Sequence, residues 1–303
     1  MVSKNTRHLM KHISPEQNLW IRIFSRNKME SNDMTMIQAN GWSFDCEIIG
    51  VGPDIIFIHG EIHGMEYWEH QVKEFSKSHR CLTYNRRGHS STGAPEYGYS
   101  LENQRRDLEA LIEHFEIKNP IIVAVAFGTT IAADYAIRHP NLVKGIVLVA
   151  WSELHDARKY FDRWVKASKQ VVDILESKGK DGLVEFLRNE GGRTVYMVIP
   201  LESPIREACI QMFANHPIEE YKQGMLEFAT SVPNLIEPFL KLDLPVVGIC
   251  GALDPFPDKP EILSGMPGFL EAPFVAGASR FVQWEKPEEF NNLMHNYLLK
   301  FHE

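Results

Sequence analysis

The sequence predicts an α/β fold, with a mostly parallel, twisted sheet, helices on both faces and an inserted helical segment. The chain has 303 residues, of which 44% are hydrophobic, so it is long enough for one large domain. Short β-branched runs alternate with amphipathic segments, which is typical of βαβ crossovers between parallel strands. The alternation stops once, in a long charged segment, and then resumes, which indicates an insertion.

The individual elements follow from local patterns. The Asn40-Gly41 pair predicts a tight turn between two short strands, the second near Trp42–Ile49. Pro287 suits the first position of a closing helix, because the N–H that it lacks would have no acceptor there. In chain order, the other expected elements are the strand Ile55–Ile58, the helix 65–78, the strand Arg80–Tyr84, the helix Leu101–Phe115, the strand Ile121–Val125, the helix 129–139, the strands Val143–Ala150, Leu244–Cys250 and Phe274–Val275, and the helix 287–301.

Three regions are expected along the chain. They are a basic N-terminal extension (1–34), a core domain in two parts (35–150 and 234–303) and a helical cap (151–233). The cap is predicted because its segment is charged and helix-like, with glycines and prolines as breakers. Within it, only Thr194–Ile199 has the pattern of a buried strand.

The composition argues against several kinds of partner. The formal net charge is −8, and nucleic acids or anionic membranes need clustered cations, so neither is favoured. No stretch has the apolar length of a membrane span. Cys46, Cys81, Cys209 and Cys250 show no CxxC spacing, so we expect them to be reduced and buried, which indicates a cytoplasmic protein. We expect a small-molecule ligand, no metal and no cofactor, and the sequence leaves a homo-oligomer open.

Four short motifs, in their order and spacing, carry a family resemblance. They are FIHG at 57–60, YNRRGHSS at 84–91, VAVAFGTT at 123–130, and GALD at 251–254 followed by QWEKPEEFN at 283–291. With these motifs the chain resembles the α/β-hydrolase superfamily, in the branch with a cap between the sixth and seventh strands. The resemblance covers roughly residues 35–301, and it implies an α/β-hydrolase fold and a site beneath the cap.

The resemblance also implies where a catalytic triad would lie. The nucleophile of this family, usually serine, sits on the sharp turn after the central strand, where this chain has Ala126. The acid position holds Asp254, and the histidine position, five residues before Glu285, holds Arg280. Loss of the serine or the histidine alone lowers turnover about a millionfold. An ordinary serine-esterase mechanism is therefore excluded for this sequence.

The oxyanion hole implied by the resemblance does not depend on the missing side chains. Its donors would be the backbone amides of Phe127 and Glu61. The Glu61 carboxylate would repel a bound anion by about 1 to 4 kcal/mol, so the Glu61 side chain must point away, be protonated or be paired with a cation. Arg280 is the natural candidate for that pairing. Two interpretations of Arg280 remain open: it fills the place of the imidazole in an ion pair with Asp254, or it holds a carboxylate, phosphate or enolate of the ligand.

Other residues have both a functional and a structural interpretation. His63, in HGEIHG, could share proton transfer with Glu61, although such a histidine is more often a surface residue of a loop. Candidates for lining the ligand cavity, or for the core of the cap, are Trp151, His155, Tyr160, Trp164, Tyr196 and Met197. We interpret His59, Arg86, Arg87 and His89 as scaffold residues.

Three functions are compatible with this pattern. The favoured one is an enzyme of non-serine mechanism, with lyase-like, decarboxylase-like or atypical hydrolytic chemistry, that acts on a small acidic carbonyl compound. The second is a catalytically silent small-molecule-binding or regulatory protein. The third is an ordinary serine hydrolase that carries an engineered serine-to-alanine change at Ala126, although Arg280 argues against this because such a change would leave the histidine in place.

Overall fold

The chain divides into two compact units, residues 1–34 and 35–303. The computed structural model describes residues 35–62, 64–155, 157–189 and 199–301, all in the second unit. The basic extension therefore lies outside the described residues, and so does nearly all of the expected strand Thr194–Ile199.

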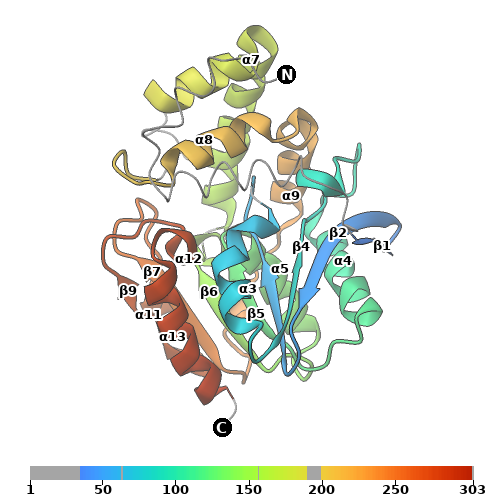
Figure 1. The fold of residues 1–303 in the computed structure, drawn as a ribbon, viewed down its shortest axis with the longest axis vertical. Helices are drawn as coiled ribbons and strands as arrows, with labels where there is room; N and C mark the ends of the chain where they lie inside the picture. Colours follow the sequence, from blue (N-terminus) through green and yellow to red (C-terminus); the bar gives the residue numbers. More distant parts are fainter. Residues whose placement is uncertain (1–34, 63, 156, 190–198, 302–303) are drawn as a thin grey trace, which may run out of the picture. The chain divides into compact units, whose positions relative to one another are not determined.

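The core of the second unit is a twisted, mostly parallel sheet, as predicted (Figure 1). Its strand order is β1-β2-β4-β3-β5-β6-β7-β8, and β9 pairs with β7. Only the pairs β1·β2 and β2·β4 are antiparallel. The strands are β1 (Thr35–Ala39), β2 (Trp42–Ile49), β3 (Asp54–Ile58), β4 (Arg80–Tyr84), β5 (Ile121–Val125), β6 (Gly145–Val149), β7 (Val246–Gly251), β8 (Phe269–Glu271) and β9 (Phe274–Val275).

Helices cover both faces of this sheet. On one face α3 contacts α12 and α13, and on the other α4 contacts α5. These elements, with the short helices of the core, are η2 (Met65–Trp68), α3 (Glu69–Phe75), η3 (Ser90–Thr92), α4 (Leu101–His114), α5 (Phe127–Arg138), α10 (Ile236–Phe239), α11 (Pro260–Leu263), α12 (Val282–Glu285) and α13 (Pro287–Lys300). The expected helix 65–78 begins as a 3-10 turn and ends at Phe75, and the expected helix 129–139 begins two residues earlier, at Phe127.

The described part of the inserted segment is mostly helical, as predicted. It comprises α6 (Ser152–His155), α7 (Ala157–Asn189), α8 (Arg206–Asn215), η5 (Glu220–Gly224) and α9 (Met225–Ser231). Gly179 breaks α7 with a φ of 66°, whereas Gly182 continues the helix. The five residues of η5 form a π-helical turn, a rare conformation that is frequently found at functional sites.

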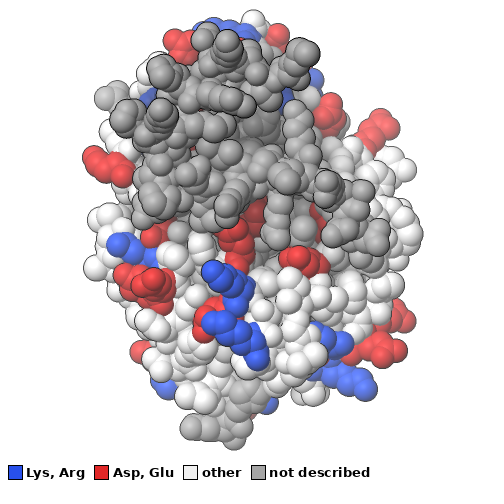
Figure 2. Space-filling view, viewed as in Figure 1, with Lys and Arg blue, Asp and Glu red and all other residues white. Residues whose placement is uncertain are grey.

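The remaining predictions concern burial and the surface. The four cysteines are free and buried, as predicted. No helix among the described residues is long and apolar enough to cross a membrane. In the part of the face that Figure 2 describes, basic and acidic side chains are interspersed, so no basic patch dominates there.

Candidate active site

Ala126 occupies a strained turn between β5 and α5. Its φ of 50° and ψ of −123° lie outside the regions that L-residues favour, which costs about 1–3 kcal/mol. Backbone bonds fix the turn: the Ala126 N–H donates to the Val149 carbonyl at 2.9 Å, and the Thr129 N–H donates to the Ala126 carbonyl at 2.9 Å. The chain therefore keeps the sharp elbow although the residue at its tip has no nucleophilic atom.

Two glycines allow the backbone to approach this elbow closely. A Cβ on Gly128 would lie 2.7 Å from the carbonyl oxygens of Ile58 and His59. A Cβ on Gly60 would lie 3.0 Å from the Cβ of Ala126. Side chains at either position would push the end of β3 away from the elbow. The loop that carries Glu61 is thus held directly against Ala126.

Phe127 begins α5, so its N–H has no acceptor within the helix, and it lies at the positive end of the helix dipole. Its ring is fully buried among aromatic rings of the cap. The ring centroids of Phe161, Trp164 and Phe228 lie 4.9, 5.4 and 5.4 Å from that of Phe127. The cap thus packs directly over the elbow.

Arg280 is buried and bonded to side chains of both the core and the cap. Its Nη1 donates to Asp254 Oδ2 at 3.1 Å and to Ser152 Oγ at 3.3 Å. Its Nη2 donates to the Ala150 carbonyl at 3.3 Å and to Glu153 Oε1. We call Arg280, Asp254, Glu153 and Ser152 the Arg280 cluster. The ion pair with Asp254, one of the two interpretations of Arg280, is present, and Glu153 adds a second carboxylate.

Carboxylates outnumber the guanidinium in this region. Burial alone would lower the pKa of Arg280, but the Glu153 and Asp254 carboxylates raise it above its ordinary value. Burial raises the pKa values of Glu153 and Asp254, and Arg280 opposes that rise. Burial raises the pKa of the nearby Asp258 well above its usual range, against the pull of Arg280. The arginine is therefore permanently charged and already occupied by protein carboxylates.

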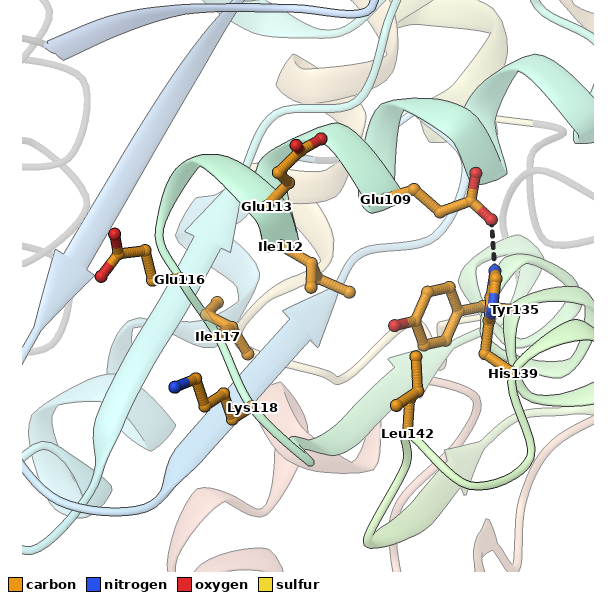
Figure 3. A pocket seen from close by; sticks show the side chains of 9 residues that line it. All are labelled: Glu109, Ile112, Glu113, Glu116, Ile117, Lys118, Tyr135, His139 and Leu142. Atoms are coloured by element: carbon orange, nitrogen blue, oxygen red, sulfur yellow. Dashed lines mark hydrogen bonds and ion pairs between the residues drawn. The ribbon is translucent and has the colours of Figure 1, made fainter.

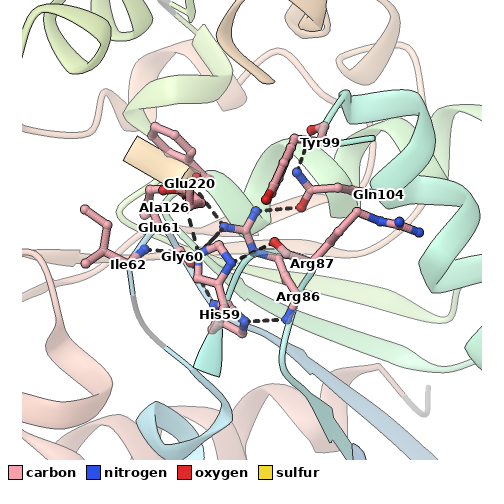
Figure 4. A network of polar contacts seen from close by, with 12 residues as sticks. His59, Gly60, Glu61, Ile62, Arg86, Arg87, Tyr99, Gln104, Ala126 and Glu220 are labelled. Carbon is pink, nitrogen blue, oxygen red and sulfur yellow. Dashed lines mark hydrogen bonds and ion pairs between the residues drawn. The ribbon is translucent and has the colours of Figure 1, made fainter. Parts of the chain in front are cut away.

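Glu61 has a different partner from the one expected. The predicted pairing with Arg280 is wrong, because Arg86 Nη2 donates to Glu61 Oε2 at 3.0 Å (Figure 4). Arg86 also donates to the Gly60 carbonyl at 3.0 Å and to Gln104 Oε1 at 2.8 Å. Arg86 follows the neighbouring strand β4, so it reaches the Glu61 loop directly, whereas Arg280 is held by the carboxylates of its own cluster.

His89 lies beside this ion pair. The Ile62 N–H donates to His89 Nε2 at 3.2 Å, so Nδ1 carries the proton and donates to the Arg87 carbonyl at 2.9 Å. Glu61 Oε1 is 3.6 Å from His89 Nε2, and Arg86 Nη2 is 3.3 Å from it. The interpretation of His89 as a scaffold residue is therefore incomplete, because its ring borders a buried carboxylate next to the elbow.

Two cap residues complete the group. His216 Nε2 and Glu220 Oε2 are 2.9 Å apart, and both side chains are buried. One potential ligand atom from each of Glu61, His89, His216 and Glu220 lies within 4.8 Å of the others. We call these four residues together with Arg86 the Glu61 cluster.

The two carboxyl groups of the Glu61 cluster have opposite pKa shifts. Burial opposes ionisation of Glu61, but the adjacent Arg86 guanidinium holds the pKa of Glu61 well below its usual range. Burial and the Glu61 carboxylate raise the pKa of Glu220 well above its usual range. Burial also lowers the pKa values of His89 and His216, so both imidazoles are neutral at pH 7. One carboxylate and one carboxylic acid thus lie side by side.

The other predicted site residues fall into two groups. His63 and Tyr196 lie outside the described residues. Trp151 is fully buried, and its ring centroid lies 5.5 Å from that of His155. The Trp164 ring packs on Phe127. Trp151 also lies close to β7, since a Cβ on Gly248 would be 2.9 Å from Trp151 Nε1, whereas Trp164 lies against the first residue of α5.

Sequence reasoning missed the cap residues that enter both clusters. His216 and Glu220 are four residues apart in HPIEE, a spacing that places two side chains on one face of a helix, and this signal could have found them. Ser152 and Glu153 carry no such signal, because only the folded chain brings them to Arg280.

An open hollow of about 610 Å³ lies elsewhere, at the amino end of the sheet (Figure 3). Its lining includes Ile117 and Lys118, just before β5, whereas Ala126 follows the carboxyl end of β5. Ligands of open α/β sheets bind at the carboxyl ends of the strands. We therefore place the candidate active site at the elbow and not in this hollow.

Comparisons with known proteins agree with this architecture. Residues 53–177 match the sequence profile of a family described by the alpha/beta hydrolase fold. The chain is 24% identical over 316 residues to epoxide hydrolase 2 of Siraitia grosvenorii, which covers 90% of this chain and 100% of that protein. It is 26% identical over 151 residues to a haloalkane dehalogenase of Mesorhizobium japonicum, which covers 49% and 47% of the two chains. A laboratory-evolved variant of potato epoxide hydrolase superposes with a TM-score of 0.70 at 22% identity, over 88% of this chain and 99% of that chain.

Proposed function

We propose that this chain, whose residues 53–177 match the alpha/beta hydrolase fold family, is an enzyme that cleaves a small carbonyl compound without a serine nucleophile. The backbone amides of Phe127 and Glu61 would hold the oxygen on which negative charge develops. In a decarboxylation of a β-keto acid, for example, the bond to the carboxylate breaks and carbon dioxide leaves. Its electron pair moves onto the ketone oxygen, and the resulting enolate then takes up a proton from water. No bond to the protein forms in this reaction.

The observation that carries this proposal is the strained shape of the elbow around a residue that has no nucleophilic atom. Ala126 keeps a strained φ of 50°, and Gly60 and Gly128 keep the close approach of the loop before Glu61. A turn that served only to connect a strand to a helix would not need this strain. The arrangement presents the first N–H of α5 at the carboxyl end of β5, which suits binding of an oxyanion.

Arg280 has no substrate-binding role in this proposal. Both of its terminal nitrogens donate to protein groups, and the two carboxylates beside it are buried. A ligand carboxylate would have to displace Asp254 or Glu153 from the guanidinium. An acidic group on the substrate is therefore not required for contact with this arginine. In a β-keto acid the carboxylate is needed only as the group that leaves as carbon dioxide.

A pair of glycine variants tests the proposal. The full chain is incubated with a panel of β-keto acids, β-hydroxy ketones and esters, and products are followed by mass spectrometry. We expect turnover of one class, and in Gly60→Ala a loss of about 100-fold, because the new Cβ would lie 3.0 Å from the Cβ of Ala126 and displace the Glu61 amide. Gly265→Ala is the control, since its Cβ would meet nothing within 4 Å. Equal turnover in Gly60→Ala and Gly265→Ala would contradict the oxyanion-hole role.

A catalytically silent binding protein is the second candidate, favoured by the internal pairing of the Arg280 cluster. The same panel distinguishes the two functions. A compound that raises the melting temperature but yields no product supports a binding or regulatory role, and turnover of that compound excludes it. An ordinary hydrolase with an engineered Ala126 is disfavoured, because Ser152 and Glu153 form a niche for the arginine that a single trapping change would not create.

A further inference from the structure

Four side chains that commonly bind metals converge where the core meets the cap. Glu61 follows β3, His89 lies in the loop after β4, and His216 and Glu220 come from the cap between α8 and η5. The four potential ligand atoms lie within 4.8 Å of one another, and all four residues are buried. Around a tetrahedral zinc ion the ligand atoms are about 3.3 Å apart, so shifts of about 1 Å would close the group on an ion.

The fold makes room for Glu220 at this place. A Cβ on Gly88 or on Gly224 would lie 2.9 Å from the Glu220 Cγ. Gly88 also has a φ of 87°, which favours glycine. Glu220 begins the π-helical turn, which brings its carboxyl group to face Glu61 rather than solvent. A buried carboxyl group that was merely tolerated would not need two glycines and an irregular helix around it.

One oxygen of this group has no hydrogen-bond partner among the described residues. Glu61 Oε2 accepts from Arg86, but no described residue donates a hydrogen bond to the buried Glu61 Oε1. A buried oxygen of a carboxylate is costly to leave unpaired. The nearest cationic group, Arg86, is bonded to the other oxygen of the same carboxylate. A cation between Glu61 and Glu220 would satisfy Oε1.

The surroundings also suit metal ligands. His89 Nδ1 donates to the Arg87 carbonyl at 2.9 Å, which directs Nε2 inward, and such an outer hydrogen bond is typical of metal-binding histidines. The His89 Nε2 also accepts from the Ile62 N–H at 3.2 Å and has Arg86 Nη2 at 3.3 Å. These contacts compete with an ion for His89, so His89 would be the weakest ligand of the four.

We propose that Glu61, His216 and Glu220, with His89 as a weaker fourth ligand, bind one divalent transition-metal ion that joins the cap to the core beside Ala126. Two imidazole nitrogens with two carboxylate oxygens are a donor set that suits Zn²⁺ or Co²⁺. The proposed function does not require this ion, so the two proposals can fail separately.

The test uses the full chain, stripped with a chelator and then titrated with Zn²⁺ and Co²⁺. We expect one Zn²⁺ per chain by calorimetry and by elemental analysis after desalting, and a visible d–d absorption band with Co²⁺. Saturating Zn²⁺ should raise the melting temperature by about 5 °C. A wild-type chain that retains no ion and gives no Co²⁺ band would overturn the site, whatever the variants do.

Variants locate the ion. Glu220→Gln and His216→Asn should each weaken binding by more than about 100-fold, since even the loss of an outer partner costs 10- to 100-fold. His89→Gln should weaken Zn²⁺ binding less than these two variants do. The control is His295→Ala, which removes an exposed histidine that lies 3.1 Å from Glu74, and it should bind Zn²⁺ like the wild type. Circular dichroism shows whether each variant is folded. Wild-type affinity in folded Glu220→Gln and His216→Asn would assign the ion to another place and reject the proposal.

A separate readout distinguishes this site from the proposed function. If Gly60→Ala loses turnover while it binds Zn²⁺ normally, the oxyanion hole and the metal site are both supported. If the wild-type chain turns over a carbonyl compound after chelation but binds no Zn²⁺, the metal site fails and the proposed function stands. If the chain binds Zn²⁺ but turns over no compound of the panel, the metal-site proposal is supported and the proposed enzymatic function is rejected.

Discussion

The Arg280 cluster and the Glu61 cluster both adjoin the elbow, but they differ in how fully their polar atoms are satisfied. Arg280 donates to the carbonyl of Ala150, next to the Val149 carbonyl that holds Ala126, and none of the four side chains in its cluster has a buried polar atom without a partner. In the Glu61 cluster, Glu61 Oε1 and Arg86 Nε are both buried and have no hydrogen-bond partner within the part of the chain that the structure describes.

This difference suggests a structural role for the Arg280 cluster and a binding role for the Glu61 cluster. Both terminal nitrogens of Arg280 donate to protein groups of the core and the cap, so this arginine stabilises the junction of core and cap. The group that is incomplete lies on the other motifs, and an incomplete buried polar group is a candidate for binding.

Removal of the guanidinium should have the largest effect on stability. Arg280→Met leaves Glu153 and Asp254 buried without a cation, and breaking a buried pair in this way costs about 3–5 kcal/mol. The measurement is urea unfolding at neutral pH. Arg188→Met is the matched control, because its ion pair with Glu207 is half exposed, and it should cost less than about 1 kcal/mol. Equal losses in the two variants would show that the Arg280 cluster does not hold the fold.

A substitution that crowds the Glu61 cluster should lower the stability of the fold less than Arg280→Met does. Gly224→Ala would place a Cβ 2.9 Å from Glu220 Cγ and 3.0 Å from Tyr99 Cδ1, and such overpacking costs about 1–3 kcal/mol. It should also weaken Zn²⁺ binding, because the Glu220 carboxyl group is displaced. Gly265→Ala, at an open and exposed position, should change stability by less than about 0.5 kcal/mol. A neutral Gly224→Ala would mean that no room is reserved for Glu220.

The pH dependence of stability tests the excess of carboxylates near Arg280. The folded-state pKa of Asp258 is raised, so its proton is bound in the folded state and lost in the unfolded state above the ordinary aspartate value. The contribution of Asp258 to the free energy of unfolding is therefore largest at low pH. It falls as the pH rises above the ordinary aspartate pKa, by up to about 1.4 kcal/mol per pH unit. Asp258→Asn should remove that slope in unfolding experiments above about pH 4. The exposed Asp243→Asn should leave it unchanged, and an unaltered slope in Asp258→Asn would contradict the assignment.

The fold was largely predictable because its signals are local. The strands Arg80–Tyr84 and Ile121–Val125 have the predicted bounds at both ends, since β-branched runs and their polar flanks are visible in the sequence. The start of α5 was placed two residues too late, because the elbow is held by contacts from Gly60 and Gly128 and not by the preferences of its own residues.

The site was predictable only where a motif fixes one position. The motifs placed Ala126, Asp254 and Arg280, and the ion pair between the last two is present. The partner of Glu61 was assigned wrongly, because the choice between Arg86 and Arg280 depends on which strand lies beside β3. The contributions of the cap could not be derived, since they arise from packing between segments more than 100 residues apart.

The smallest effect is expected where the two clusters meet, at Ala126 itself. In Ala126→Ser the new hydroxyl would need a base, and Arg280 cannot accept a proton because neighbouring carboxylates hold its pKa above the ordinary value. Ester hydrolysis should therefore stay at the wild-type level, because removal of the base from a catalytic triad lowers kcat about a millionfold. The double variant Ala126→Ser with Arg280→His, in which an imidazole could face Asp254, should exceed both single variants in a chromogenic ester assay. Hydrolysis by Ala126→Ser alone would reveal a base in the Glu61 cluster and would remove the distinction between a structural and a reactive group of charges.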